Sequence, residues 1–157
     1  MSERRTGRTT LEAIETEVAL LMRRAEATRR AGGEAPHRAL DRAAYLVLRR
    51  LESDGPLQIN ALADALGLDG STVTRQVSAL ERDGLVRRGR SEADGRAIVV
   101  TPTAGGLRRM AGVRAARIDL YERILAGWEE RDRVALGSLL TRLNHDMERV
   151  IRTSGAP

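Results

Sequence analysis

Residues 61–96, which read ALADALGLDGSTVTRQVSALERDGLVRRGRSEADGR, decide the fold of this chain. The stretch opens with apolar residues at three- and four-residue spacing, which predicts a helix with one apolar face: Ala61, Leu62, Ala65 and Leu66. Gly67 is expected to end this helix, because the left-handed conformation after a last turn is least costly for glycine. Leu68 then returns toward the core, and Asp69 or Ser71 caps a second helix by accepting hydrogen bonds from its free backbone N–H groups. The pattern predicts two helices joined by a tight turn.

The second helix of this pair has an apolar side and a polar side. Its apolar stripe has spacings of four and three residues and consists of Val73, Val77 and Leu80. The polar side consists of Ser71, Thr72, Thr74, Arg75, Gln76 and Ser78. These are short donors and acceptors plus one arginine, the types that contact base edges and phosphates in the major groove of DNA. The pair therefore predicts a helix-turn-helix DNA-binding motif, although Arg75 also fits as a solvated helix residue.

A hairpin with a charged tip is expected next. Gly84 ends the second helix, and residues 86–100 combine a basic run, turn-forming residues and a short β-branched run. Phosphate contacts are expected from the arginines of the first strand, Arg87, Arg88 and Arg90. At the tip, Arg96 can enter a narrow minor groove, whose potential attracts guanidinium groups, and Asp94 can hold an arginine through a bidentate pair. Asp94 followed by Gly95 is equally typical of a plain turn.

Helices are also expected on both sides of this motif. Apolar residues at helical spacing predict them at residues 9–30, 37–53, 103–126 and 130–152. Residues 1–8 carry arginines and few apolar groups, so a mobile tail is expected there, with a phosphate-contacting arm as the alternative. Thr103 can cap the third of these helices, whose start is expected to fray because Gly105 and Gly106 lower its helix propensity.

The last predicted helix carries a narrow apolar seam. Its apolar residues repeat at four and three positions, as in a heptad: Leu136, Leu140, Leu143, Met147 and Val150. Such a seam needs a partner helix, and DNA-binding proteins of this kind commonly act as symmetric pairs. We therefore expect a homodimer formed by the first, fifth and sixth helices, with Leu11 and Ile14 of the first helix in the interface. The alternative is that the seam packs inside one protomer.

Four parts of the sequence together resemble the MarR (multiple antibiotic resistance regulator) family of winged helix-turn-helix proteins. They are LADALGL at 62–68, STVTRQVSALERDGLVRR at 71–88, DGR at 94–96 and the Thr-x-x-Gly of 103–106. The resemblance extends more loosely to the flanking helices. It implies a third edge to the hairpin at residues 57–58, and an effector site between the DNA-binding lobe and the dimer helices. Mapped onto this chain, that site is bordered by His37, Asp41 and Tyr45, although Tyr45 fits equally well as an ordinary half-buried helix residue.

Composition excludes several other classes of protein. The chain has 157 residues, enough for one domain, and its 41% hydrophobic but 2% aromatic content favours an aliphatic helical core. It has no cysteine, so disulfides are excluded, and it has no apolar run of the roughly 20 residues that a membrane span needs. The net charge of +5 fits a polyanionic partner. Every one of the positively charged Lys and Arg positions is arginine, which a coding bias also explains. His37 and His145 lack metal-ligand spacing and would need Asp41 or Glu148 as further ligands, so no metal and no cofactor are expected.

The sequence therefore predicts a mainly α protein of one protomer, residues 1–157. A winged helix-turn-helix DNA-binding lobe with a small β-hairpin wing is expected at 37–103, and N- and C-terminal dimerisation helices at 9–31 and 104–152. No catalytic constellation is suggested by spacing, so we expect a cytoplasmic, non-enzymatic regulator rather than an enzyme. Its expected partners are double-stranded DNA, a second copy of itself and a small-molecule effector, and the resemblance implies a repressor. The alternatives are a sequence-indifferent architectural DNA-binding protein, or a helical interaction module with a vestigial DNA-binding motif.

Overall fold

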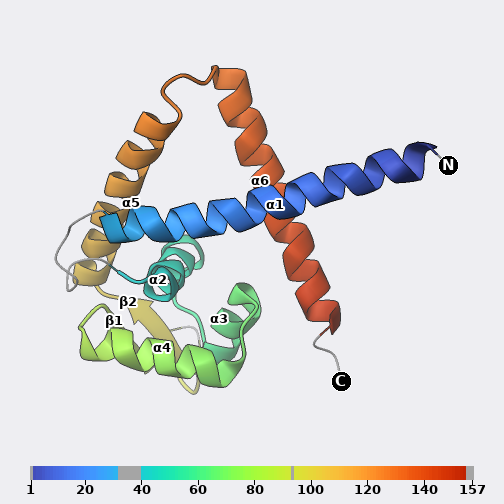
Figure 1. The fold of residues 1–157 in the computed structure, drawn as a ribbon. Helices are drawn as coiled ribbons and strands as arrows, with labels where there is room; N and C mark the ends of the chain where they lie inside the picture. Colours follow the sequence, from blue (N-terminus) through green and yellow to red (C-terminus); the bar gives the residue numbers. More distant parts are fainter. Residues whose placement is uncertain (1, 32–39, 93, 155–157) are drawn as a thin grey trace. The chain divides into compact units, whose positions relative to one another are not determined.

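A computed structural model describes residues 2–31, 40–92 and 94–154 of the chain. Along the sequence it forms α1 (Ser2–Ala31), α2 (Arg42–Asp54), α3 (Ile59–Leu66), α4 (Gly70–Arg82), β1 (Val86–Arg90), β2 (Ile98–Pro102), α5 (Ala104–Ile124) and α6 (Glu130–Ser154) (Figure 1). The chain divides into two compact units, Met1–Ala39 and Leu40–Pro157. The predicted fold class, mainly helical with one small antiparallel hairpin, is confirmed.

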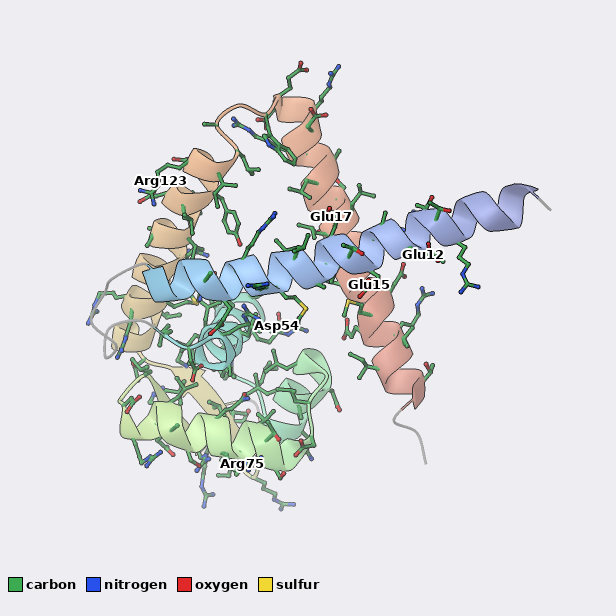
Figure 2. The ribbon with its side chains drawn as sticks, viewed as in Figure 1. Glu12, Glu15, Glu17, Asp54, Arg75 and Arg123 are labelled. Carbon is green, nitrogen blue, oxygen red and sulfur yellow. The ribbon has the colours of Figure 1, made fainter. Side chains whose placement is uncertain are left out.

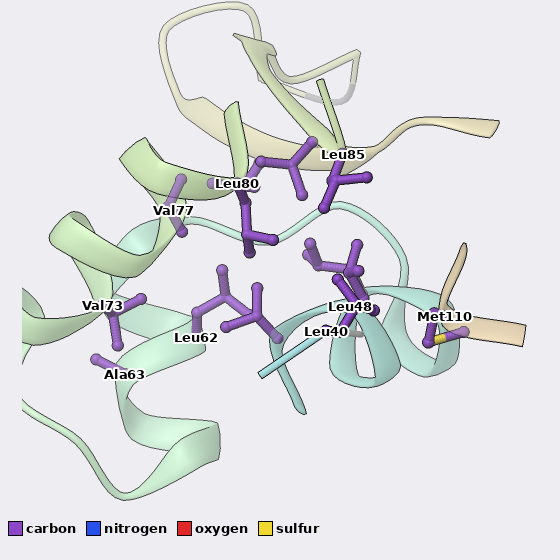
Figure 3. Close-up of a cluster of buried hydrophobic side chains, with 13 residues drawn as sticks. Leu40, Leu48, Leu62, Ala63, Val73, Val77, Leu80, Leu85 and Met110 are labelled. Carbon is purple, nitrogen blue, oxygen red and sulfur yellow. The ribbon is translucent and has the colours of Figure 1, made fainter. Parts of the chain in front are cut away.

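The core of the second unit consists mainly of aliphatic side chains that pack around α2. Figure 3 shows side chains of α2, α3, α4 and the start of the hairpin meeting in one cluster. The side chains that are almost completely buried are Val47, Leu48, Leu51, Leu62, Val73, Val77, Val86, Val100 and Met110. Val73 and Val77 of the predicted apolar stripe of α4 are among them, and Leu80 is buried as well, so the opposite side of α4 must face outward.

The turn between α3 and α4 follows the predicted pattern, with one exception. Gly67 adopts a left-handed φ of 64°, and the Leu68 N–H donates to the Ala63 carbonyl (3.0 Å), which closes the end of α3. The prediction that the Leu68 side chain returns to the core is wrong, because it is 40% exposed. The Leu68 backbone closes the turn, while the buried side chains of α3 are Leu62 and Ala63, with Leu66 packed against the same core.

The hairpin pairs β1 with β2 in an antiparallel register that runs from Val86 opposite Pro102 to Arg90 opposite Ile98. Leu57 adds one further bridge, since its N–H donates to the Val100 carbonyl (3.2 Å) and its carbonyl accepts from the Val100 N–H (2.8 Å). The third edge that the family resemblance implied is therefore present as a single bridge.

The start of α5 is held against the end of α4, contrary to the expected fraying. Thr103 caps the helix by accepting from the Gly106 N–H (3.0 Å), and its hydroxyl donates to the Gly84 carbonyl (2.8 Å). Gly106 lies so close to Leu85 that a Cβ built on it would be 2.1 Å from the Leu85 carbonyl oxygen. The glycine that lowers helix propensity is thus what lets the helix approach Leu85, between α4 and β1.

Two helix starts differ from the prediction. α1 begins at Ser2, so residues 2–8 are helical rather than a tail, and an i,i+4 ion pair between Arg8 and Glu12 (3.3 Å) supports this extension. α2 begins at Arg42 because the Asp41 carboxylate accepts from the Ala44 N–H (2.6 Å) and caps the helix. The predicted residues 37–39 of α2 lie outside the described part of the chain.

α5 has a packed half and an exposed half. Leu107, Met110 and Val113 pack on the core, and the Arg114 guanidinium contacts the Glu52 carboxylate of α2 at 3.2 Å. Beyond this point the apolar side chains Ile118, Tyr121 and Ile124 are 50–59% exposed. The first half of α5 therefore belongs to the same packed lobe as α2, α3, α4 and the hairpin.

Candidate nucleic-acid interface

The outward side of α4 carries the polar residues that the sequence singled out. Because Val73, Val77 and Leu80 are buried, Ser71, Thr74 and Arg75 are exposed, while Thr72, Gln76 and Ser78 are half-buried at its edges. Figure 2 shows Arg75 projecting from this outward side, away from the last turn of α5, where Arg123 lies. The helix thus presents hydroxyls and a guanidinium on a surface that the core does not use.

Asp69 organises the first turn of α4. Its Oδ1 accepts from the Ser71 hydroxyl (2.5 Å) and the Thr72 N–H (2.8 Å), and its Oδ2 accepts from the Thr72 hydroxyl (2.6 Å). The Ser71 hydroxyl, followed by the Thr72 hydroxyl and N–H, holds the pKa of the Asp69 carboxyl well below its usual range. Asp69 is therefore ionised at neutral pH and acts only as an acceptor.

The remaining polar groups of α4 have partners of their own. The Thr74 hydroxyl donates to the Gly70 carbonyl (2.7 Å), and Arg75 Nη2 donates to the Thr72 hydroxyl (3.3 Å). Gln76 Oε1 is buried without a hydrogen-bond partner among the described residues. The amide group of Gln76 is therefore partly turned into the protein rather than fully toward the exposed side.

The arginines of β1 differ in what they contact. Arg87 is exposed, while Arg90 Nη1 donates to the Gly95 carbonyl (3.2 Å) and braces the hairpin. Arg88 faces α4: its backbone N–H and Nη1 contact the Glu81 carboxylate (3.0 and 3.3 Å), and Nη2 donates to the Ser78 hydroxyl (2.9 Å). Arg88 therefore fixes the hairpin to the polar edge of α4.

Asp94 shapes the tip of the hairpin through backbone groups. Its Oδ1 accepts from the Arg96 N–H (3.0 Å), its carbonyl accepts from the Ala97 N–H (3.0 Å), and its own N–H donates to the Ser91 hydroxyl (3.2 Å). These bonds correspond to the plain-turn alternative for Asp94 rather than to a carboxylate that holds a guanidinium. The turn leaves the Arg96 side chain exposed at the tip.

Sequence reasoning missed two features of this surface. It proposed Asp69 as a cap but not its capture of two hydroxyls, for which the Asp-x-Ser-Thr spacing is the available signal. It did not identify Glu81 at all. No local pattern reveals the contact of Glu81 with Arg88, because it joins a helix to a strand whose relative position depends on the whole lobe.

Two of the three candidate effector residues lie in the described chain. The Asp41 carboxylate is engaged as the cap of α2. Tyr45 is half-buried, and the Arg117 guanidinium of α5 lies over its ring, 4.3 Å from the centroid. His37 lies outside the described residues. Within the described part of the chain, no group of three or more His, Cys, Asp or Glu side chains is arranged to hold a metal ion.

The predicted interface helices expose their apolar residues. On α6, Leu140 and Leu143 are 39% exposed, Met147 and Val150 more so, and Leu136 is half-buried. On α1, Leu11 and Ile14 are exposed as well. Within the described ranges, no helix combines the length and the apolar content that crossing a membrane requires.

Comparison with known proteins gives consistent results. A sequence model of the MarR family matches residues 40–98, the part of the chain from the end of the undescribed segment to the start of β2. The uncharacterized HTH-type transcriptional regulator YxaD of Bacillus subtilis is 34% identical over 138 residues, which cover 85% of this chain and 92% of YxaD.

Among the solved structures that resemble this fold, two come from proteins with a stated relation to DNA. FabT of Streptococcus pneumoniae, solved in complex with DNA, has a TM-score of 0.72 at 18% identity and covers 88% of this chain and 98% of its own. BpsR of Bordetella bronchiseptica has a TM-score of 0.62 at 25% identity and covers 81% of this chain and 92% of its own. The DNA binding of BpsR is regulated by 6-hydroxynicotinic acid.

Proposed function

This chain belongs to the MarR family of transcriptional regulators, and on that basis we propose that it is a homodimeric, ligand-responsive repressor that binds an inverted-repeat operator in the cytoplasm. The observation that carries the proposal is the exposed polar side of α4 with the arginine-bearing hairpin fixed beside it. Both elements belong to one packed lobe, so they meet a DNA duplex as a single surface.

In the proposed complex, each lobe contacts two grooves. The exposed side of α4 enters a major groove, where Arg75 can donate two hydrogen bonds to a base or a phosphate. Arg96 enters the neighbouring minor groove from the tip of the hairpin, and Arg87 contacts the phosphates between them. Arg88 and Arg90, which the sequence grouped with the phosphate contacts, hold the hairpin in position and contribute charge.

The exposed seam of α6, together with the apolar residues of α1, supports a dimer. Five apolar residues at heptad spacing on one side of α6 leave a surface that a second copy of the same helix region can cover. A two-fold pair then places two lobes on successive major grooves, with half-site centres about 34–36 Å apart.

Regulation by a small molecule is supported by the likeness to BpsR. We place the effector near Asp41 and Tyr45 of α2, where Arg117 of the second half of α5 lies over the Tyr45 ring. A ligand that binds better to a dimer whose lobes misfit the operator weakens DNA binding, and by linkage DNA weakens ligand binding by the same factor.

Selection of bound fragments from random duplex DNA, followed by competition, tests this function. We expect one inverted-repeat consensus, bound about 10³-fold more tightly than random DNA. If the dimer neutralises about eight phosphates, log affinity should fall with log salt at a slope of about −7. Equal affinity for random DNA would support the architectural alternative, and no binding even at low salt would support a protein-interaction module.

A further inference from the structure

The hydroxyls at the start of α4 are restricted in the hydrogen bonds that they can offer. A serine or threonine hydroxyl has one hydrogen to donate and two lone pairs that accept. Since an ionised carboxylate has no hydrogen to donate, Ser71 and Thr72 must each direct their one hydrogen at Asp69. The Thr74 hydroxyl likewise directs its hydrogen at a backbone carbonyl. What the exposed Ser71 and Thr74 present outward is therefore lone pairs alone.

The same carboxylate makes this helix start a poor phosphate site. The N–H groups of a first turn commonly bind phosphate, but here the Thr72 N–H already donates to Asp69 at 2.8 Å. A second anion would meet the negative charge of Asp69 and two acceptor-only hydroxyls. A nucleic-acid group that fits must be a neutral donor.

We propose that Asp69 is a specificity-determining residue that makes Ser71 an obligate acceptor for the exocyclic amino group of adenine or cytosine in the major groove. This inference rests on the proposed function. Adenine N6 and cytosine N4 donate from the major-groove edge, whereas guanine and thymine present only acceptors there. A free serine hydroxyl can donate to an acceptor or accept from a donor, and so does not distinguish these two pairs of bases. Because the Asp69 carboxylate takes the Ser71 hydrogen, the Ser71 hydroxyl can only accept. Charge-assisted bonds are roughly twice as strong as neutral ones, so rotation of the Ser71 hydroxyl away from Asp69 is unfavourable.

The test compares the consensus selected from random duplexes by the full-length protein and three variants. Ser71→Ala identifies the base pair that Ser71 contacts, as the one whose preference disappears. Asp69→Asn keeps a capping side chain of nearly equal quality, but its amide can donate to a hydroxyl and so free the hydroxyl hydrogen. Asp64→Asn removes the same charge from the exposed surface of α3 and serves as the control.

At the base pair defined by Ser71→Ala, wild-type protein should prefer adenine or cytosine over thymine or guanine by about fivefold on the contacted strand. Asp69→Asn should reduce this ratio to about twofold or less, with guanine newly tolerated, while Asp64→Asn keeps the wild-type ratio. Thermal melting of each variant shows that the lobe remains folded. The inference is overturned if Asp69→Asn keeps the fivefold ratio, if Ser71→Ala alters no preference, or if the wild type prefers guanine or thymine there. A wild type that selects no consensus overturns the proposed function itself.

Discussion

Leu140→Arg is expected to separate the two protomers. Leu140 lies in the middle of the α6 seam and is 39% exposed, so a partner helix would cover it. A buried charge without a partner costs roughly 3 kcal/mol or more, and a two-fold interface contains the substitution twice. We therefore expect dimer affinity to fall on the order of 10⁴-fold. Sedimentation velocity at micromolar concentration should show a dimer for the wild type and a monomer for the variant.

Ser138→Arg is the matched control for this substitution. Ser138 is two residues, about 200°, from Leu136 and so lies on the opposite side of α6. It is exposed, and the same added charge there should leave the dimer intact. An unchanged dimer in Leu140→Arg would show that the seam does not form the interface. Loss of the dimer should also weaken operator binding, because two linked lobes gain affinity from each other.

Gly106→Ala is expected to destabilise the DNA-binding lobe more than other single-methyl additions to α5. The new Cβ would lie 2.1 Å from the Leu85 carbonyl oxygen and 3.2 Å from Leu48 Cδ2, and the first of these atoms is backbone. The start of α5 must therefore move away from the end of α4, at a cost of about 3 kcal/mol. For a chain of this size that corresponds to a fall in Tm of roughly 6–12 °C.

Gly105→Ala provides the control from the neighbouring position. Its Cβ would meet only the Thr103 hydroxyl oxygen at 3.6 Å, which is ordinary contact, and alanine favours the helix. Gly105→Ala should therefore be neutral or slightly stabilising. Both variants are compared by thermal unfolding followed by circular dichroism at one protein concentration, because dimerisation affects apparent stability. Equal midpoints for the two variants would mean that the close approach of Gly106 to Leu85 does not exist in solution.

Much of the DNA-binding lobe could be predicted because its signals are local. The stripe of Val73, Val77 and Leu80 has helical spacing, and all three side chains are buried as expected. The conformation of Gly67 and the capping roles of Asp69 and Thr103 also follow from short-range backbone chemistry. A helix-turn-helix whose second helix has one polar side follows directly from such patterns.

Several of the errors lie where the outcome depends on parts of the chain that are distant in sequence. The helix propensity of Gly106 suggested fraying, but its approach to Leu85 is set by how α5 packs on the lobe. The Arg88 guanidinium is held by contacts with Glu81 and Ser78 of α4, and the alternation of residues along a strand does not reveal such contacts. The direction of each hydroxyl hydrogen in α4 required the positions of the acceptors. Sequence patterns predict which residue types lie on the surface. They do not predict which hydrogen-bond donors and acceptors of those residues remain available to a base.

We propose that α4 and the tip of the hairpin contact one duplex, twice, across a two-fold axis. Hydroxyl-radical footprinting on the selected operator tests this claim most directly, with wild-type protein beside Arg96→Ala and the control Arg123→Ala. We expect two symmetric protected regions about one helical turn apart. In Arg96→Ala alone, the minor-groove protection should be lost and affinity reduced about tenfold. A single or continuous protected region, or full minor-groove protection by Arg96→Ala, would contradict it.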